Sequence, residues 1–294
     1  MKIILGIIIA SLFSSAVYAQ EINFGSPAVQ EVSIRISENG NAHVTHEVQQ
    51  SMQTQQVDFV SDNFTNFTII DDEGEEPQYA ETGGEKPGLV LFPTRDDVII
   101  EYDVEGIMQQ KDGLWTLDYL YLAPSAFYLP DGVKLFYVNE KLVQLEDKQG
   151  LKCHGCQVTL EYELEPTILT KQVQWQDKKF DVKMITQTEI SEVNLDQQQK
   201  TISIKVTEKD KYITLIIPRE LLWNPYEVFL NEKPILHQEQ IDVGNNVWLH
   251  IKPNEAGTVD IIGVSVVPEF PFTTILVLSA AMIAVVYANR FSHR

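Results

Sequence analysis

Alternation of apolar and polar residues around a tight turn is the feature that most restricts the fold of this chain. Residues 32–36 and 42–48 both alternate, and Asn39-Gly40 stands between them. The positions in phase are Val32, Ile34, Ile36, Ala42, Val44, His46 and Val48. Successive side chains of a β-strand point to opposite faces, and Asn-Gly favours a two-residue turn. The pattern therefore predicts a β-hairpin with one buried face, and it places His46 among the core residues.

Similar short runs continue between the two ends of the chain, where helical periodicity is almost absent. The predicted strands are 67–70, 89–92, 98–104, 114–122, 134–138, 158–162, 172–175, 180–186, 201–206, 212–217, 226–230, 247–251 and 259–264. Turn clusters such as DDEGEEP and LPDG separate them, and ELEPT at 163–167 is the best linker candidate. We expect an all-β fold of two tandem β-sandwich (immunoglobulin-like) domains, 20–165 and 166–267.

The first residues have the pattern of a signal peptide. MKIILGIIIASLFSSAVYAQ has one basic residue, an apolar stretch and then Val17-Tyr18-Ala19. Small or modest side chains at positions −3 and −1 from the cut, here Val17 and Ala19, fit a signal-peptidase site. We therefore expect residues 1–19 to be removed by a cut between Ala19 and Gln20. The alternative is an uncleaved N-terminal anchor.

The last residues, 268–294, have the pattern of a membrane anchor. Residues 272–288 are apolar and uncharged, and Arg290 and Arg294 follow them. This length is at the lower limit of the roughly 17–25 residues that cross a bilayer as a helix, and basic residues favour the cytoplasmic side. We expect a single-pass protein of the cell membrane with its ectodomain outside the cell and its C-terminus cytoplasmic. A buried core helix is the alternative.

Pro268, Glu269 and Phe270 precede this apolar run. Together with the helix and the short basic end, they resemble the P-E-F class of C-terminal anchoring signal found on archaeal surface proteins and read by archaeosortases. Segments such as CHGC and TLIIPRELL also resemble secreted surface proteins of the ammonia-oxidising archaea. The resemblance implies that the helix is removed and that the new C-terminus is joined to a lipid.

Strong acidity limits the classes of partner. The formal net charge is −20, and it falls almost entirely between the two ends. Such a surface repels phosphate backbones and anionic lipid headgroups, which argues against nucleic-acid binding. The partners that remain are the membrane, through the C-terminal helix, and an envelope protein or glycan.

Both cysteines lie in one short motif, GLKCHGCQVTLEY. Outside the cell, Cys153 and Cys156 are expected to form one disulfide across a very small loop, in which Gly155 supplies a positive φ. A metal site is the alternative, because Cys153, Cys156 and His154 are ligands that suit copper or zinc. The third alternative is a redox role, in which Cys153 and Cys156 exchange between the thiol and disulfide forms. His43 does not join His46 in a metal site, because strand residues three apart face opposite ways.

Three further motifs have both a functional and a structural reading. DNFTNFT holds two sequons, which make Asn63 and Asn66 candidate N-glycosylation acceptors. DDEGEE at 71–76 has the oxygen ligands of a calcium site, but a solvated hairpin tip is the preferred interpretation. The aromatic run LWTLDYLYL favours core packing over a ligand platform.

The sequence holds no nucleophile elbow, phosphate loop or zinc-protease motif. We therefore expect a membrane-anchored cell-surface protein with a structural or partner-binding role in the cell envelope. The alternative is an extracytoplasmic metal or redox protein that uses the Cys-His-Gly-Cys motif.

Overall fold

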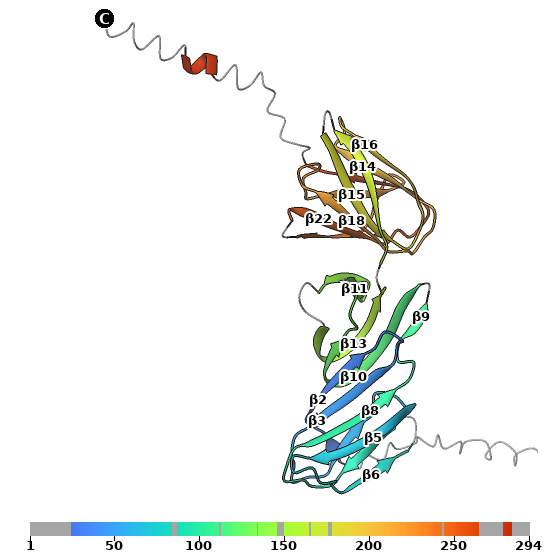
Figure 1. The fold of residues 1–294 in the computed structure, drawn as a ribbon, viewed down its shortest axis with the longest axis vertical. Coiled ribbons are helices and arrows are strands. Elements are labelled where there is room, and N and C mark those ends of the chain that lie inside the picture. The colour runs from blue at the N-terminus through green and yellow to red at the C-terminus, as the bar shows by residue number, and fades with distance from the viewer. Residues whose placement is uncertain are drawn as a thin grey trace, which may run out of the picture. The chain divides into compact units, whose positions relative to one another are not determined.

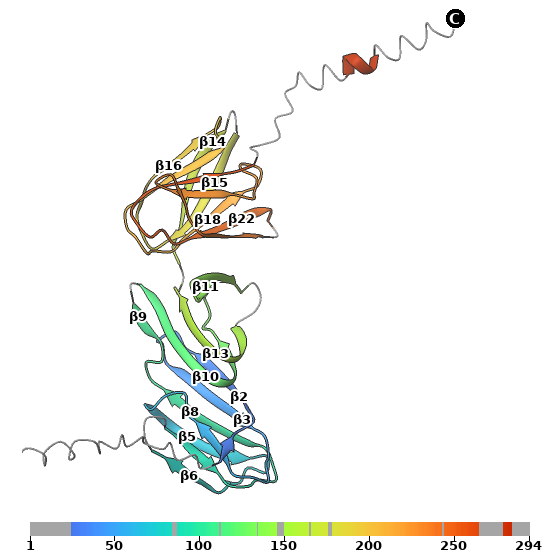
Figure 2. The ribbon, with the colours of Figure 1, turned by 180° about the vertical axis from the view of Figure 1, so that it is seen from behind.

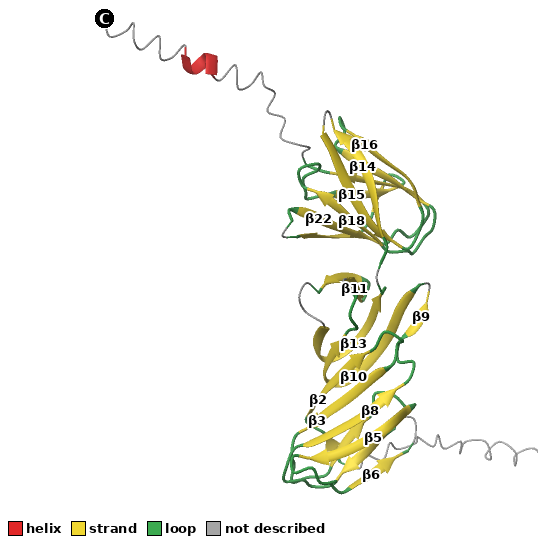
Figure 3. Cartoon of the chain, viewed as in Figure 1, coloured by secondary structure: helices red, strands yellow, loops and turns green. Residues whose placement is uncertain are grey.

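The computed structural model describes residues 25–264, except 84–86, 112, 134, 146–149, 165, 176–177 and 243, and it also describes 279–283. The predicted signal peptide with its cut between Ala19 and Gln20, the anchor motif Pro268-Glu269-Phe270 and most of the run 272–288 lie outside these residues. Apart from the short helical segment 279–283, the regular structure of the described residues is β-strand (Figure 3). No helix among them has the length and apolar character needed to cross a bilayer.

The chain divides into two compact units that interleave along the sequence. Unit 1 consists of residues 1–109, 117–131 and 147–158, and unit 2 of residues 110–116, 132–146 and 159–294. Strand β13 ends at Tyr162 and β14 begins at Ile168, so the predicted linker at 163–167 lies between two strands.

Unit 1 packs a small sheet against part of a larger one. The small sheet has the order β1 (Ser26–Pro27), β4 (Gln55–Asp58), β7 (Gly88–Leu91), β6 (Tyr79–Thr82). The large sheet has the order β12 (Lys141–Gln144), β11 (Leu135–Val138), β13 (Gly150–Tyr162), β10 (Leu114–Tyr128), β2 (Gln30–Ile36), β3 (Ala42–Val48), β8 (Val98–Val104), β5 (Phe64–Asp71), and β9 (Gln109–Lys111) pairs with β10 (Figure 1).

The predicted hairpin is confirmed as β2 and β3, which pair antiparallel from Gln30↔Val48 to Ile36↔Ala42. Both strands alternate buried and exposed residues, as the sequence pattern indicates. Gly40 has φ of 81° in the turn, a conformation that glycine adopts without steric cost. Val57 of β4 and Leu89 and Leu91 of β7 are also buried, and the His46 ring of β3 contacts the Phe59 ring just after β4, with centroids 6.4 Å apart. The core of unit 1 therefore lies between its two sheets.

Unit 2 is a β-sandwich of two five-stranded sheets (Figure 2). One sheet has the order β14 (Ile168–Trp175), β15 (Lys178–Thr186), β18 (Ile213–Pro218), β22 (Asn246–Ile251), β21 (His237–Ile241). The other has the order β16 (Ile190–Asp196), β17 (Thr201–Val206), β23 (Gly257–Ile262), β19 (Glu227–Leu230), β20 (Lys233–Pro234). Their facing side chains, such as Leu215 and Ile204, form one buried cluster.

The hairpin of β11 and β12 belongs to unit 2 because it packs on strands of that sandwich. The Tyr137 ring stacks on the Tyr212 ring with centroids 4.0 Å apart, and the Tyr212 hydroxyl donates a 2.5 Å hydrogen bond to Glu161. The Gln238 side chain forms two hydrogen bonds with the backbone of Leu142. These contacts explain why residues 132–146 are grouped with unit 2.

The all-β prediction is confirmed, but the list of strands was incomplete. Strands β4, β6, β12, β16 and β21 were not predicted. Strands β4, β6 and β12 are short, β21 is rich in glutamine and glutamate, and the pairing of β16 shifts register between Ile190 and Val193, which interrupts its apolar alternation. The predicted hairpin tip at DDEGEE is wrong, because β5 before it and β6 after it belong to different sheets.

A candidate binding groove in unit 1

The Cys-His-Gly-Cys motif lies within strand β13 and not in a loop ahead of a strand. Cys153 is half-buried and His154 is exposed. Cys153 is not a free thiol, whereas the side chain of Cys156 lies outside what the structure describes, so their pairing stays a prediction. The expected small loop before the strand is wrong, because β13 already begins at Gly150.

Gly155 brings this motif against strand β10. It has φ of 61°, which confirms the positive φ expected from the sequence. A Cβ atom added at Gly155 would lie 2.7 Å from the carbonyl oxygen of Leu122, which is closer than real Cβ contacts. Lys152, two positions before His154, forms a 2.5 Å hydrogen bond and ion pair with Glu31 of β2. The motif therefore borders the segments around Leu122 and Glu31.

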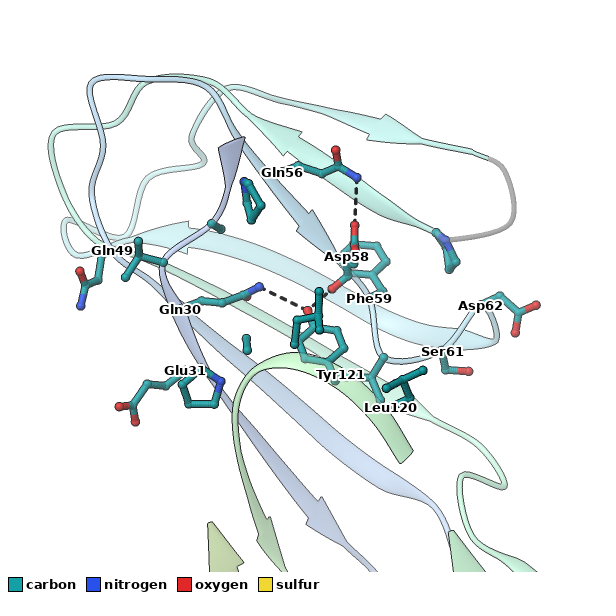
Figure 4. Close-up of a pocket in the computed structure, with 18 residues that line it drawn as sticks. Gln30, Glu31, Gln49, Gln56, Asp58, Phe59, Ser61, Asp62, Leu120 and Tyr121 are labelled. Carbon is teal, nitrogen blue, oxygen red and sulfur yellow. Dashed lines mark hydrogen bonds between the residues drawn. The ribbon is translucent and has the colours of Figure 1, made fainter. Parts of the chain in front are cut away.

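These segments line a cavity of about 890 Å³ within unit 1. Residues 27–31, 56, 58–62 and 120–124 form most of its wall, and Gln49 and Pro87 complete it. The first segment leads from β1 into β2, the second begins in β4 and continues beyond it, and the third belongs to β10 (Figure 4). We call this cavity the groove.

The groove opens where β10 separates from β2. Their parallel ladder begins at the pair Ser125↔Val32 and continues to Tyr128↔Arg35. Pro124 has no N–H group to donate, so it interrupts a ladder that would otherwise extend back along β10. In the segment 120–124, which precedes this ladder, the Tyr121 hydroxyl reaches the backbone carbonyl of Asp58 at the end of β4.

Three large aliphatic side chains at the groove are exposed to solvent. The exposed fractions are 58% for Val29, 71% for Leu120 and 88% for Leu122. Exposed single leucines are ordinary, but three beside one cavity form a patch of the kind that marks an interaction site. Their exposure was not predicted, because LYL presents aliphatic residues to one face of the strand and an aromatic residue to the other.

The other face of β10 confirms the prediction of core packing for the aromatic run. Leu117 and Tyr119 are buried, and Trp115 and Tyr121 are partly buried. The Tyr119 hydroxyl forms a 2.7 Å hydrogen bond with Ser125. Burial raises the pKa of Tyr119 to about 12, so its hydroxyl is neutral at physiological pH.

Polar groups form the floor of the groove (Figure 4). The Gln30 side-chain amide donates to the Tyr121 hydroxyl at 3.3 Å, and Tyr121 in turn donates to the backbone carbonyl of Asp58. Gln56 donates to the Asp58 carboxylate at 3.0 Å. The floor therefore joins β10 and β2 of the large sheet to β4 of the small sheet.

His46 continues this hydrogen-bonded chain into the core. Its Nδ1 lies 2.7 Å from Gln30 Oε1 and its Nε2 lies 2.8 Å from the Tyr102 hydroxyl. Since Gln30 Oε1 only accepts, His46 donates from Nδ1 and accepts the Tyr102 hydrogen at Nε2. The Tyr102 oxygen accepts from the Val60 N–H at 2.9 Å. His46 is fully buried, which confirms the prediction that it is a satisfied core residue.

The groove carries negative charge. Glu31, Asp58 and Asp62 contribute carboxylates, and none of the lining residues that the structure describes is lysine or arginine. Lys152 reaches Glu31 from outside the lining and is the main cause of the lowered pKa of that carboxyl. The described residues contain no group of three or more histidine, cysteine, aspartate or glutamate side chains placed to hold a metal ion.

The two predicted sequons differ in their surroundings. Asn66 has φ of 54° where the pairing of β5 with β8 shifts register, and its Nδ2 donates to Asp103 at 2.7 Å. That hydrogen bond is the first cause of the lowered pKa of Asp103, which also contacts His43 at 2.8 Å. Asn63 is exposed in the bend that follows Asp62 at the groove.

Comparison with known proteins adds no family. No family model matches the chain, and no curated protein matches it. Six chains of solved structures match. One is the crystal structure of an aminopeptidase N family protein from Idiomarina loihiensis, with 8% sequence identity and a TM-score of 0.32. The match covers 52% of this chain and 32% of that chain, and a similarity this low supports no argument about fold or activity.

We expect acid to destabilise unit 1 through His46. Burial lowers its pKa from 6.5 to about 3 in the folded chain. Because the unfolded chain binds the proton at higher pH, the stabilisation is complete above about pH 6.5 and is lost progressively as the pH falls towards 3, by about 1.4 kcal/mol per pH unit. Native-state hydrogen exchange of the β3 amides, corrected for the intrinsic rate, measures this loss.

The matched variants separate His46 from other titrating groups. His46→Gln should flatten the pH dependence of β3 protection, although it lowers protection at neutral pH. His250→Asn changes a buried histidine of unit 2, where burial lowers the pKa to about 4, and should leave the β3 slope unchanged. A slope that persists in His46→Gln would contradict the assignment.

We expect Asn63, and not Asn66, to be the glycosylated sequon. The Asn66 amide nitrogen is held by Asp103, whereas the Asn63 side chain is exposed in a bend. Glycopeptide mass spectrometry of the chain from its native cells should find the glycan at Asn63, and Asn63→Gln should abolish it. Asn66→Gln is the matched control and should leave the glycan in place. A glycan carried mainly by Asn66 would refute this expectation.

Proposed function

We propose that this chain is a membrane-anchored cell-surface protein with a partner-binding role in the cell envelope, and that the partner binds in the groove. The observation that carries the proposal is the exposure of Val29, Leu120 and Leu122 beside one cavity. Covering such side chains removes apolar surface from water, which gives about 25 cal/mol per Å² of driving force for association. The polar floor supplies directional groups that select the partner.

The location is the second part of the proposal, and sequence patterns support it. They are the signal-peptide pattern before Gln20, the P-E-F motif at 268–270 and the apolar run 272–288. An immunoglobulin-like character of unit 2, glycosylation at the sequon and a Cys153–Cys156 disulfide belong to the same proposal. The resemblance to archaeal surface proteins supports an anchor at the C-terminus.

Site-specific photocrosslinking tests the groove as the binding site. The full chain carries a photoreactive residue in place of Leu122 and is mixed with envelopes isolated from its native cells. Leu236 of unit 2 is the matched control position, because it is an equally accessible leucine with an exposed fraction of 95%. We expect a discrete adduct from position 122, and native chain that stays with the envelope fraction after a high-salt wash.

Two results would contradict the proposal. Position 122 and position 236 could yield the same adducts in similar amounts, which would mean that exposure alone determines the reaction. Alternatively, the native chain could leave the envelope in salt, which would contradict an anchor in the membrane.

A metal or redox role for the Cys-His-Gly-Cys motif is the second candidate. The observation that favours it is the place of the motif beside the groove, with His154 exposed and Gly155 against Leu122. Such a site would use Cys153, Cys156 and His154 to hold copper or zinc, or would exchange a disulfide with a partner. The groove would then bind the molecule on which the motif acts.

Native and denaturing mass spectrometry of the full chain separates the two candidates. The partner-binding proposal expects the mass of the reduced chain less two hydrogens, without a metal adduct, because Cys153 and Cys156 form a structural disulfide. The alternative expects a reduced chain that carries copper or zinc and loses it in Cys153→Ser and Cys156→Ser. His43→Asn, an exposed histidine outside the motif, is the matched control and should not affect the metal.

A further inference from the structure

We infer that the occupant of the groove is an extended polypeptide segment that carries aliphatic and basic side chains. This inference rests on the proposed function, because it names the chemistry of the partner that would bind there. Three properties of the groove lead to it: the kind of apolar surface it exposes, the sign of its charge and its dimensions.

The apolar surface of the groove is aliphatic. Val29, Leu120 and Leu122 are its exposed apolar side chains. The two aromatic residues of the described lining pack against other rings. Phe59 is buried with the Phe64 and Tyr102 centroids 4.9 and 5.1 Å away. Tyr121 is partly buried with the His46 and Tyr119 centroids 6.1 and 6.0 Å away. Sugars and nucleobases bind proteins largely by stacking on exposed aromatic rings. An aliphatic rim instead suits aliphatic side chains.

The sign of the charge selects a cationic partner. Glu31, Asp58 and Asp62 line the groove, none of the described lining residues is lysine or arginine, and Lys152 is paired with Glu31. Phosphates, carboxylates and anionic headgroups are repelled by such a site, whereas lysine and arginine side chains are attracted. The negative charge of the whole chain acts in the same direction over longer distances.

The shape of the groove suits an extended chain. Residues 27–31 and 120–124 form two walls that come from neighbouring strands of one parallel pair. Five residues of strand span roughly 13–16 Å, which accommodates about four or five residues of an extended peptide. A volume of about 890 Å³ is also at the upper end of the range for specific ligand sites. The walls place leucine and carboxylate side chains along the same short length. A peptide with aliphatic and basic residues can therefore contact the leucines and pair with the carboxylates.

Fluorescence polarisation with three labelled hexapeptides tests this chemistry on the full chain in mild detergent. The probes alternate leucine with lysine, leucine with glutamate, and serine with lysine. We expect the leucine–lysine peptide to bind, and both other peptides to bind at least about tenfold more weakly, because each lacks one of the two complementary features.

Matched variants locate the binding in the groove. The double variant Leu120→Ser/Leu122→Ser should weaken the leucine–lysine peptide about tenfold or more, because two aliphatic contacts are lost. Leu236→Ser in unit 2 removes an exposed leucine elsewhere and should have no effect. Asp62→Asn should weaken binding more than Asp72→Asn, an exposed aspartate outside the lining. Because these side chains are on the surface, circular dichroism should show unchanged folding.

The inference is overturned if either the leucine–glutamate peptide or the serine–lysine peptide binds as tightly as the leucine–lysine peptide. It is also overturned if Leu236→Ser weakens binding of the leucine–lysine peptide as much as the double variant does. Failure of all three peptides also overturns it. If no peptide binds but the photoreactive residue at position 122 gives a specific crosslink, the proposed function is supported and the groove binds a partner of different chemistry. Peptide binding without that crosslink would support the chemistry of the groove and contradict its proposed use in the envelope.

Discussion

The hydrogen bond from the Tyr102 hydroxyl to His46 Nε2, 2.8 Å long and buried between the sheets of unit 1, fixes the polar chain on which the groove depends. A neutral imidazole has one donor and one acceptor, so this bond commits Nδ1 to donate to Gln30. Gln30 then has only its amide hydrogens left, and one of them goes to Tyr121. Burial removes the water that would solvate a charged imidazolium, and this desolvation lowers the pKa of His46 to about 3.

The same chain of bonds holds the two sheets of unit 1 together beside an opening. Tyr121 reaches the backbone of Asp58 after β4, and the Val60 N–H reaches Tyr102 on β8. Pro124 lies directly before the ladder of β10 with β2, and at this point hydrogen bonds of the Tyr121 and Tyr102 side chains connect the two sheets. A groove with a polar floor and an aliphatic rim results from this combination.

The location and the groove are independent arguments about function. The location rests on the two ends of the sequence, most of which fall outside the described residues, and the groove rests on contacts within unit 1. The two proposals are compatible, because binding of a peptide segment in an acidic groove would require neither an intracellular location nor a nucleotide. The Cys-His-Gly-Cys motif is the point at which the two candidate functions meet, because it borders the groove through Lys152 and Gly155.

Local pattern alone determined the all-β class, the hairpin around Asn39-Gly40, the buried phase of His46 and the positive φ of Gly155, since each depends on side-chain alternation or on backbone sterics. Strand β21, which is rich in glutamine and glutamate, and strand β16, whose pairing shifts register between Ile190 and Val193, were missed because they lack a regular alternation. Only the tertiary structure could show the groove. Its walls come from residues 27–31, 56, 58–62 and 120–124, and no local rule states which distant segments become neighbours. The exposed Leu120 and Leu122 lie in β10 just before its ladder with β2, and that ladder joins segments about ninety positions apart in the sequence.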